Sequence, residues 1–246
     1  MATPIEPQNV DVVILAGGKG TRLRPLTAVF PKPLVPIGER PVLDILLTRL
    51  SRLGFRRITL CTGYLEELLR AVLGDGGRFG LQIRYNHEDT PLGTAGPLAL
   101  LEDLTDTFMV MNGDLLTTLD FRRMLAHHDE HDADATIAVY RRDVKIDFGV
   151  IGSDGDGGFV RYQEKPEYHF EVSMGVNVLN RSVLQHIRPG DYADMPDLIT
   201  RTHDHGGLVR CYREDCYWLD IGRMEDYATA QDHFAENQDL FLGESA

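Results

Sequence analysis

The residues best suited to chemistry lie in one stretch near the start of the chain. After an apolar run at 12–15 come a glycine-rich turn and two basic residues: Gly17, Gly18, Gly20, Arg22 and Lys32. Backbone N–H groups in such a turn can approach phosphate oxygens closely, because glycine lacks a Cβ and adopts positive φ at little cost. The stretch is not a P-loop, and Leu23 replaces the third glycine of the dinucleotide pattern. It therefore predicts a phosphate-binding loop of another type.

Two aspartates further along the chain are candidate metal ligands. Asp114 follows Gly113 after an apolar run, and Asp220 ends the short run 217–219. Either aspartate alone is more often a turn or helix-cap residue. Two carboxylates that converge on phosphates are what Mg²⁺ requires, since it is held by one or two carboxylates together with phosphate oxygens and water.

Alternating strands and helices must position these groups. Strands are expected at 12–15, 58–62, 83–85, 108–111 and 136–140, with helices at 42–53, 65–73, 95–104 and 121–131. This alternation predicts an α/β fold with a Rossmann-like, mostly parallel sheet sandwiched by helices. Ligands of such sheets bind at the carboxyl ends of the strands, which is where the glycine turn and Asp114 fall.

The pattern changes after residue 140 to a mixed α+β portion that contains a hairpin. Its expected elements are a hairpin from 149–151 and 159–162, strands at 176–179 and 209–212, and helices at 183–187, 197–203 and 224–234. We expect one domain at 11–236, divided into halves at 11–140 and 141–236, between a flexible tail at 1–10 and a second tail at 237–246.

Composition excludes some partners and favours a compartment. The net charge of −13 over 246 residues argues against binding to nucleic acid or to an acidic membrane. No apolar run is long enough to span a bilayer, the first ten residues lack signal-peptide features, and three cysteines suit free thiols, so a cytoplasmic protein is expected. His127, His128 and His131 favour a solvated helix face over a metal site. A homo-oligomer remains open.

The stretch Leu15–Pro36, LAGGKGTRLRPLTAVFPKPLVP, resembles the signature of the sugar-1-phosphate nucleotidylyltransferases, LAGGxGTRLxPLTxxxPKPLxP. Further segments are similar to motifs of that family: GD at 113–114, PLGTAG at 91–96, EKP at 164–166 and WLDIG at 218–222. The resemblance covers nearly all of 11–236. It makes 11–140 the nucleotide-binding half and 141–236 the sugar-phosphate-binding half.

Residue roles follow from the same resemblance. The nucleotide-binding residues it implies are Leu15, Ala16, Gly17, Gly18, Gly20, Thr21, Arg22, Glu88, Gly93 and Thr94. The catalytic residues are Arg22, Lys32, Asp114, Lys165 and Asp220, with Asp114 and Asp220 as ligands of Mg²⁺. The sugar-phosphate-binding residues are Asn112, Gly149, Glu164, Lys165, Gly175 and Asn177.

Two segments bear on the choice of substrates. Glu88 precedes PLGTAG, where a carboxylate can accept hydrogen bonds from guanine N1–H and N2–H₂, although a plain solvated role fits as well. The segment 173–177, SMGVN, departs from the family pattern while keeping Gly175, which leaves the sugar in doubt. GTP and a manno- or heptose-type sugar 1-phosphate are favoured.

The expected reaction joins a nucleoside triphosphate to a sugar 1-phosphate and releases pyrophosphate. Alternatives are a dTTP- or UTP-dependent glucose-1-phosphate nucleotidylyltransferase and a non-catalytic regulatory subunit that binds nucleotide sugars. An NAD-dependent oxidoreductase is disfavoured, because Leu23 occupies the position of the fingerprint glycine.

Overall fold

The computed structural model describes residues 5–242. The strands are β1 (Asp11–Leu15), β2 (Pro36–Ile37), β3 (Arg40–Pro41), β4 (Arg57–Thr62), β5 (Gln82–His87), β6 (Thr107–Asn112), β7 (Leu115–Thr117), β8 (Ala135–Lys145), β9 (Val150–Ser153), β10 (Phe159–Gln163), β11 (Glu167–Asn180), β12 (Val209–Arg213) and β13 (Trp218–Asp220). The α-helices are α1 (Val42–Arg52), α2 (Glu66–Leu73), α3 (Phe121–Glu130), α4 (Met195–Asp204), α5 (Met224–Glu236) and α6 (Gln238–Leu242).

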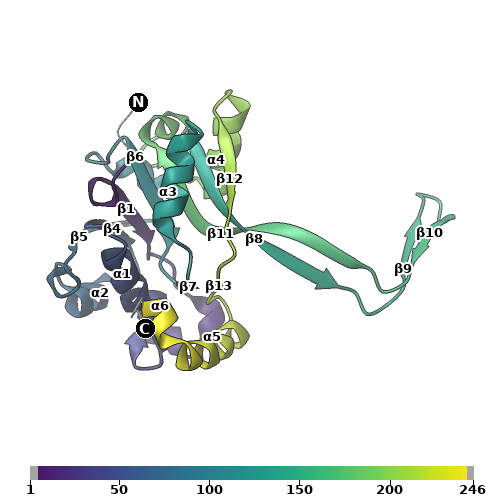
Figure 1. Cartoon of the computed structure of the whole chain (residues 1–246), viewed down its shortest axis with the longest axis horizontal. Helices are drawn as coiled ribbons and strands as arrows, with labels where there is room; N and C mark the ends of the chain where they lie inside the picture. The colour runs from purple at the N-terminus through teal and green to yellow at the C-terminus, as the bar shows by residue number, and fades with distance from the viewer. Residues whose placement is uncertain (1–4, 243–246) are drawn as a thin grey trace.

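A seven-stranded sheet forms the centre of the molecule, in the order β12-β8-β11-β6-β1-β4-β5 (Figure 1). β1 pairs in parallel with β4 on one side and β6 on the other, and β11 is the antiparallel strand between β6 and β8. After Asp11, β1 is apolar throughout, as expected for a parallel strand buried on both faces. Four of the six pairings are parallel, which confirms the expected mostly parallel α/β sheet.

Two hydrophobic cores cover the two faces of this sheet. Val12 and Ile14 of β1 belong to one core, together with apolar residues of α1, α2 and α3. Val13 belongs to the other, together with residues of α4 and of the 3-10 turns at 96–100 and 181–186. The two faces of β1 alternate because successive side chains of a strand point to opposite sides. Among the described residues, no helix combines the length and apolar character needed to cross a membrane.

The structure corrects the expected helix at 95–104. Only Gly96–Leu100 is helical, and it is a 3-10 turn with Pro97 near its start. The N–H groups of Ala95 and Gly96 both donate to the carbonyl oxygen of Ala193, at 2.9 and 3.0 Å. These hydrogen bonds join the segment to the chain just before α4.

Both expected tails are partly packed, in contrast to the prediction. Pro7–Asn9 forms a 3-10 turn and Val10 is fully buried, while residues 1–4 and 243–246 lie outside the described part. Residues 238–242 form α6, which packs against α1 and α5. The apolar pattern of this short helix, Leu-Phe-Leu at its end, was too brief to distinguish from a tail.

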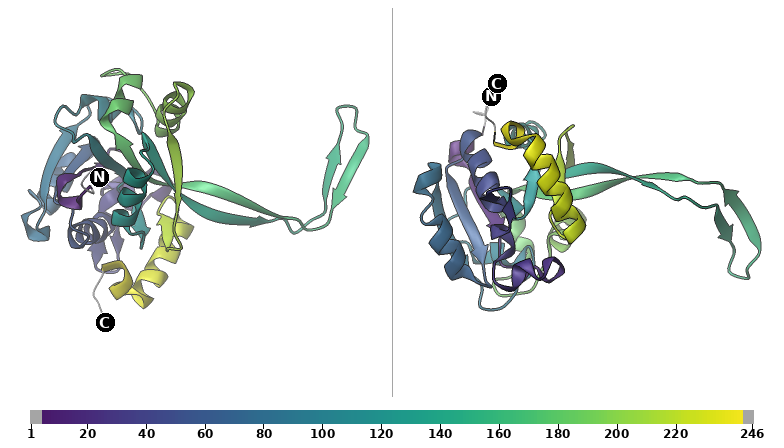
Figure 2. Two further views of the ribbon diagram at one scale, coloured as in Figure 1. Left: turned by 45° about the horizontal axis from the view of Figure 1, so that its top comes forward. Right: turned by 90° about the horizontal axis from the view of Figure 1, so that it is seen from below.

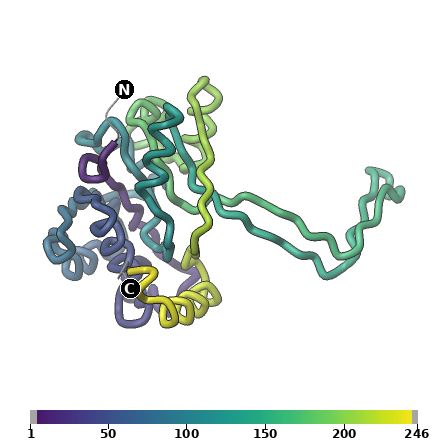
Figure 3. The backbone as a smooth tube through the Cα atoms, in the orientation of Figure 1, coloured from purple at the N-terminus to yellow at the C-terminus, as the bar shows by residue number. Residues whose placement is uncertain are grey.

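A long two-stranded arm leaves the sheet, and the sequence did not predict it (Figures 1 and 2). β8 and β11 run far beyond the expected strands at 136–140 and 176–179, and they stay paired from Ser173↔Val139 to Glu167↔Lys145. The expected hairpin, β9 with β10, is confirmed at the far end. The tube in Figure 3 shows the two strands of the arm extending away from the rest of the molecule. We call residues 140–172 the arm and the remainder the body.

Phe241→Ala is expected to lower the free energy of unfolding by about 3 kcal/mol, the usual loss for a buried phenylalanine. Phe241 is 1% exposed, and its ring lies 5.1 Å from that of Tyr217 and 5.9 Å from that of Phe234. Urea unfolding followed by circular dichroism measures the change. The matched control is Leu240→Ala, a neighbour that is 55% exposed and should change stability by less than about 0.5 kcal/mol. Equal stabilities of the two variants would show that α6 does not pack in solution.

Candidate active site

The glycine-rich loop begins where β1 ends and is held in shape by its own residues. Gly20 has φ of +58°, and a Cβ there would lie 2.9 Å from the side chain of Thr27. The Thr27 hydroxyl donates to the carbonyl oxygen of Gly20 at 2.6 Å. Leu23, which departs from the dinucleotide fingerprint, is fully buried in a core with Ile37 and Phe234. The loop is therefore anchored at both ends, which leaves the backbone at 17–20 facing a cavity.

A cavity of about 780 Å³ lies beside this loop. Its lining includes all ten residues expected to bind nucleotide: Leu15, Ala16, Gly17, Gly18, Gly20, Thr21, Arg22, Glu88, Gly93 and Thr94. Lys32 and Asp114 line it as well. The structure thus gathers residues from three separate segments into one space at the carboxyl ends of the parallel strands. Their individual roles stay predictions.

A second, smaller cavity of about 240 Å³ adjoins the first and shares Leu15, Thr94 and Asn112 with it. Asn112, Gly175 and Asn177, three of the residues expected to bind sugar phosphate, line this space together with Asp220. Gly175 has φ of +70°, and a Cβ there would lie 2.5 Å from the Asn112 amide nitrogen. Any other residue at 175 would displace Asn112, so the glycine shapes this cavity.

Asp114 and Asp220 face each other through the pairing of β7 with β13, in which Asp220 is opposite Leu115. Lys32 lies between them: its ammonium contacts Asp114 Oδ2 and is 3.7 Å from Asp220 Oδ1. The Oδ1 atoms of both aspartates are buried and have no hydrogen-bond partner among the described residues. Burial and the charge of Asp114 raise the pKa of the Asp220 carboxyl, despite the opposing charges of Lys32 and Arg22.

This pair of carboxylates fits a magnesium ion. Buried acceptors without donors are uncommon, and hard oxygen ligands from two carboxylates are the donor set that Mg²⁺ takes in phosphate sites. A cation held by these two carboxylates would also offset the repulsion that raises the pKa of Asp220. The single ammonium of Lys32 only partly does so.

Glu88 is a half-buried carboxylate in the wall of the larger cavity. Its Oε2 accepts a hydrogen bond from the Leu92 N–H at 3.2 Å, and its Oε1 faces Gly17. Burial raises the pKa of this carboxyl, although the Leu92 N–H acts in the opposite direction. The hydrogen bond from Leu92 holds the half-buried side chain at the cavity wall, in contrast to a freely solvated residue.

Sequence reasoning missed Asp194, which holds the PLGTAG segment in place. Its Oδ1 accepts from the Thr94 N–H at 3.0 Å and from the Thr94 hydroxyl at 3.2 Å. Its Oδ2 accepts from the hydroxyl of Tyr192, which lines the larger cavity. Asp194 and Asp197 form a capping box at the start of α4. The spacing of these two aspartates before an apolar run was the signal in the sequence.

Three predicted residues lie elsewhere. Gly149, Glu164 and Lys165 are at the far end of the arm, and none of them lines either cavity. They therefore do not lie beside Asn112, Gly175 and Asn177 in this structure, and their part in a sugar-phosphate site stays a prediction. The reason is the continuous pairing of β8 and β11, which carries the EKP segment away from the body (Figure 1).

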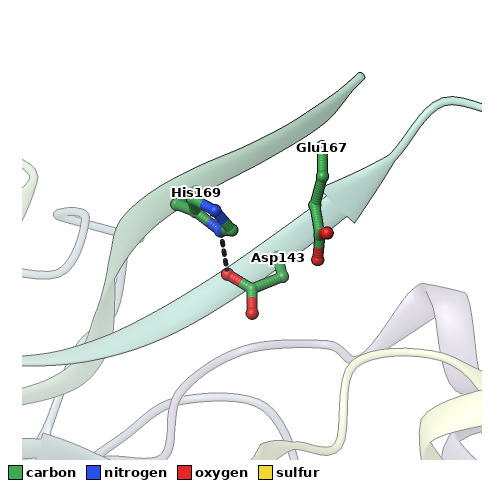
Figure 4. A group of neighbouring side chains, drawn as sticks. All are labelled: Asp143, Glu167 and His169. Atoms are coloured by element: carbon green, nitrogen blue, oxygen red, sulfur yellow. Dashed lines mark hydrogen bonds and ion pairs between the residues drawn. The ribbon is translucent and has the colours of Figure 1, made fainter. Parts of the chain in front are cut away.

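One further group of side chains is close enough to hold a metal ion, and it also lies on the arm. Asp143, Glu167 and His169 have ligand atoms within 4.8 Å of one another (Figure 4). All three side chains are exposed, and Asp143 already accepts from His169 at 2.6 Å and from Arg141 at 3.0 Å. The guanidinium beside Asp143 opposes a second cation, so we assign no site to this group.

Among α/β proteins, a glycine-rich loop and an acidic pair at the carboxyl edge of a sheet define a narrow class. A family model described as nucleotidyl transferase matches residues 11–237, and the chain belongs to that family. This confirms the resemblance seen in the sequence.

Three relatives illustrate the range of the family. The chain is 36% identical to the mannose-1-phosphate guanylyltransferase of Mycobacterium tuberculosis, over 89% of this chain and 63% of that protein. It is 34% identical to the UTP–glucose-1-phosphate uridylyltransferase of Synechocystis sp., over 89% and 61% of the two chains. HddC from Yersinia pseudotuberculosis, in a crystal structure with GMP-PN, is 26% identical with a TM-score of 0.69, over 92% of this chain and 99% of that one. The chain spans about three fifths of the length of the first two relatives.

Asp220→Asn is expected to raise the melting temperature of the metal-free protein at pH 7. Folding raises the pKa of this carboxyl above its ordinary value of 3.8, so the folded state holds the proton more tightly than the unfolded chain. Stability is therefore lost as pH rises from 3.8 through the raised value. An amide does not titrate, so the gain should shrink as the pH approaches about 4. Thermal unfolding in EDTA, followed by circular dichroism, measures the difference.

Asp215→Asn, which removes an exposed carboxylate close by, is the matched control and should leave the melting temperature unchanged. Added MgCl₂ should raise the melting temperature of the unaltered protein but not that of Asp220→Asn. A variant that melts below the unaltered protein in EDTA at pH 7 would contradict the repulsive pair.

Proposed function

We propose that the protein transfers a nucleotidyl group from a nucleoside triphosphate to a sugar 1-phosphate, with release of pyrophosphate. The observation that carries this proposal is the acidic pair, whose two buried Oδ1 atoms accept no hydrogen bond from any described residue, where a large cavity meets a small one. The large cavity has the glycine loop of a phosphate site, and the small one has the size and polar groups for a sugar. Membership of the nucleotidyl transferase family and the names of the relatives support the same reaction.

In this proposal the chain itself binds and orients both substrates. Backbone N–H groups of the loop at 17–20 donate to the triphosphate, and Arg22 and Lys32 offset its charge. Asp114 and Asp220 hold Mg²⁺, which supplies Lewis-acid polarisation of a phosphoryl oxygen. Asn112 and Asn177 offer hydrogen-bonding amides to the sugar from the wall of the small cavity.

The reaction needs no general base. The phosphate of a sugar 1-phosphate has its second pKa near 6, so it is already largely dianionic at neutral pH. One of its oxygens attacks the α-phosphorus of the triphosphate, a new P–O bond forms, and the bond to the β-phosphate oxygen breaks. Pyrophosphate leaves with that electron pair. Catalysis then consists of alignment and charge stabilisation.

A catalytic protein is better supported than a non-catalytic nucleotide-sugar sensor. A sensor has no need to keep the charged residues of the transfer step, whereas Arg22, Lys32, Asp114 and Asp220 all lie together here. A cytoplasmic location is part of this proposal, because all three cysteines are free, as suits a reducing compartment.

Guanine is the proposed base. Glu88 is fixed in the cavity wall by the Leu92 N–H, and a carboxylate there can accept from both Watson–Crick donors of guanine. Two relatives point the same way by name, since one is a guanylyltransferase and the other was crystallised with GMP-PN. The uridylyltransferase relative is the counterexample that the experiments must address. Mannose 1-phosphate is the first acceptor to test.

The proposed reaction predicts pyrophosphate release from a matrix of nucleoside triphosphates and sugar 1-phosphates, with GTP as the best donor. Asp114→Asn should lower turnover by at least about 100-fold, because it removes one of the two carboxylates proposed to hold Mg²⁺. A coupled pyrophosphate assay across MgCl₂ concentrations measures the loss, and circular dichroism checks the fold. No release with any pair of substrates would contradict the proposal, and full activity of Asp114→Asn would contradict the role of the acidic pair.

Glu88→Gln should narrow the preference for GTP over UTP and dTTP. A bidentate contact to guanine discriminates by about 5- to 150-fold, and an amide presents a donor to at least one guanine donor. Catalytic efficiencies for the three triphosphates measure the preference in each protein. The matched control is Asp89→Asn, which removes the same charge from the adjacent, fully exposed side chain and should leave the preference for GTP unchanged. UTP or dTTP as the better donor for the unaltered protein would contradict the guanine proposal.

A further inference from the structure

The arm leaves the body at the edge where the cavities open. β8 and β6 run in the same direction, because both are antiparallel to β11. β8 therefore extends past the carboxyl ends of the parallel strands, and Ser173, where the arm pairing ends in the body, lines the smaller cavity. The paired stretch from Val139 to Lys145 alone spans about 20 Å at the usual rise per residue. The hairpin extends this reach.

The arm carries apolar side chains that the body does not cover. The large exposed ones are Val144, Phe148, Ile151, Phe159, Val160, Tyr162 and Phe170, with 39% to 77% of each accessible. Within residues 5–242, β9 and β10 pair only with each other. A lone two-stranded ribbon is marginal in water, and seven large apolar side chains exposed along one arm favour an interaction site. Something must cover the arm.

The small cavity lacks the charge that its substrate requires. None of the described residues that line it is a lysine or arginine, while Asp220 adds a negative charge. Arg22 and Lys32 lie toward the larger cavity and the acidic pair. A sugar phosphate dianion placed beside two aspartates needs a cation of its own. The site within one chain is incomplete in this respect.

Lys165 is a cation without a partner. Its side chain is exposed and makes no hydrogen bond or ion pair with any described residue. Its backbone has φ of 43°, in the left-handed region that a lysine rarely adopts. Glu164 beside it accepts from the Tyr162 hydroxyl at 3.1 Å. The end of the arm thus presents to solvent a lysine with a strained backbone and an unpaired ammonium among the described residues.

The arm does not reach the small cavity in the body of its own chain. β8 and β11 each continue without a break from the sheet into the arm, and all views show the arm pointing away from the body (Figures 1 and 2). The body has exposed apolar residues at or near the wall of the larger cavity, and an arm from another molecule can cover them. Tyr192 in the wall of the larger cavity is 64% exposed. Val29 and Phe30 are 65% and 50% exposed. They follow Ala28, whose carbonyl oxygen accepts a hydrogen bond from Tyr64 in the same wall.

We propose that two copies of this chain exchange arms, so that Lys165 and Glu164 of each copy complete the small cavity of the other. Twofold symmetry makes the exchange reciprocal: one operation covers both arms and fills both sites. The Lys165 ammonium pairs with the phosphate of the sugar 1-phosphate, and Glu164 accepts hydrogen bonds from sugar hydroxyls. This inference rests on the proposed function, and it differs from that function in assigning the acceptor site to two subunits.

Complementation between two defective variants tests the exchange. Asp114→Asn damages the body and leaves the arm intact, whereas Lys165→Ala does the reverse. In a co-expressed pair carrying different tags, about half of the dimers are mixed and each mixed dimer has one intact site, so about a quarter of normal turnover should return. Each variant alone should lose at least about tenfold in turnover at low acceptor concentration. Lys145→Ala, an exposed lysine on the same arm, is the matched control and should keep normal turnover.

A mixture of Asp114→Asn with Asp220→Asn, both damaged in the body, should recover nothing. Activity of the unaltered protein together with no recovery in the first mixture would overturn the exchange and leave the proposed function standing. An unaltered protein without activity contradicts the proposed function instead.

Sedimentation velocity tests the exchange without reference to activity. The unaltered chain should sediment as a dimer, and Phe148→Asp with Phe159→Asp should shift it to monomer, because both phenylalanines are exposed within one chain. An unaltered protein that is monomeric at micromolar concentration would overturn the proposal. So would a dimer that the double variant leaves intact.

Discussion

The constraint on which the site depends is the meeting of two carboxylates. Asp220 ends β13, which pairs with β7, and Asp114 directly precedes β7, so the fold holds like charges together at the edge of the sheet. Burial makes this arrangement more unfavourable, because the charges lose water that would screen them. Lys32 is the one ammonium between them. The sheet therefore keeps a region of stored repulsion that a bound cation relieves, and the glycine loop brings the phosphates to that same place.

Much of this arrangement could be predicted from the sequence, and for a clear reason. Strand–helix alternation fixes which loops share an edge of a parallel sheet. The glycine turn after β1 and Asp114 after β6 were placed on one edge by that rule alone, and β6 indeed pairs directly with β1. The residues expected to bind nucleotide all reached one cavity because each of their segments follows a parallel strand.

The sequence failed where a residue's position depends on distant pairing. The strands β8 and β11 were predicted only where they are buried, although the outer part of β11 alternates polar residues with Tyr168, Phe170 and Val172. That alternation indicates a strand, but it does not identify β8 as the partner or show that the pair leaves the body. The role of Lys165 was inferred from the family resemblance, whereas its location in the structure is set by the arm. Asp194 was missed for a related reason, since its contact with Thr94 spans 100 residues.

β11 has a consequence for how the protein responds to its substrate. The same strand provides Gly175 to the small cavity, turns at an irregularity in its pairing between Ser173 and Asn177, and then forms half of the arm. If the arm joins two subunits, the sugar phosphate and the second subunit are linked ligands of one strand. Thermodynamic reciprocity then applies: if association of the subunits increases the affinity for the sugar 1-phosphate by some factor, the sugar 1-phosphate increases the affinity between the subunits by the same factor. The affinity for the sugar 1-phosphate then depends on protein concentration, and dilution alone lowers that affinity.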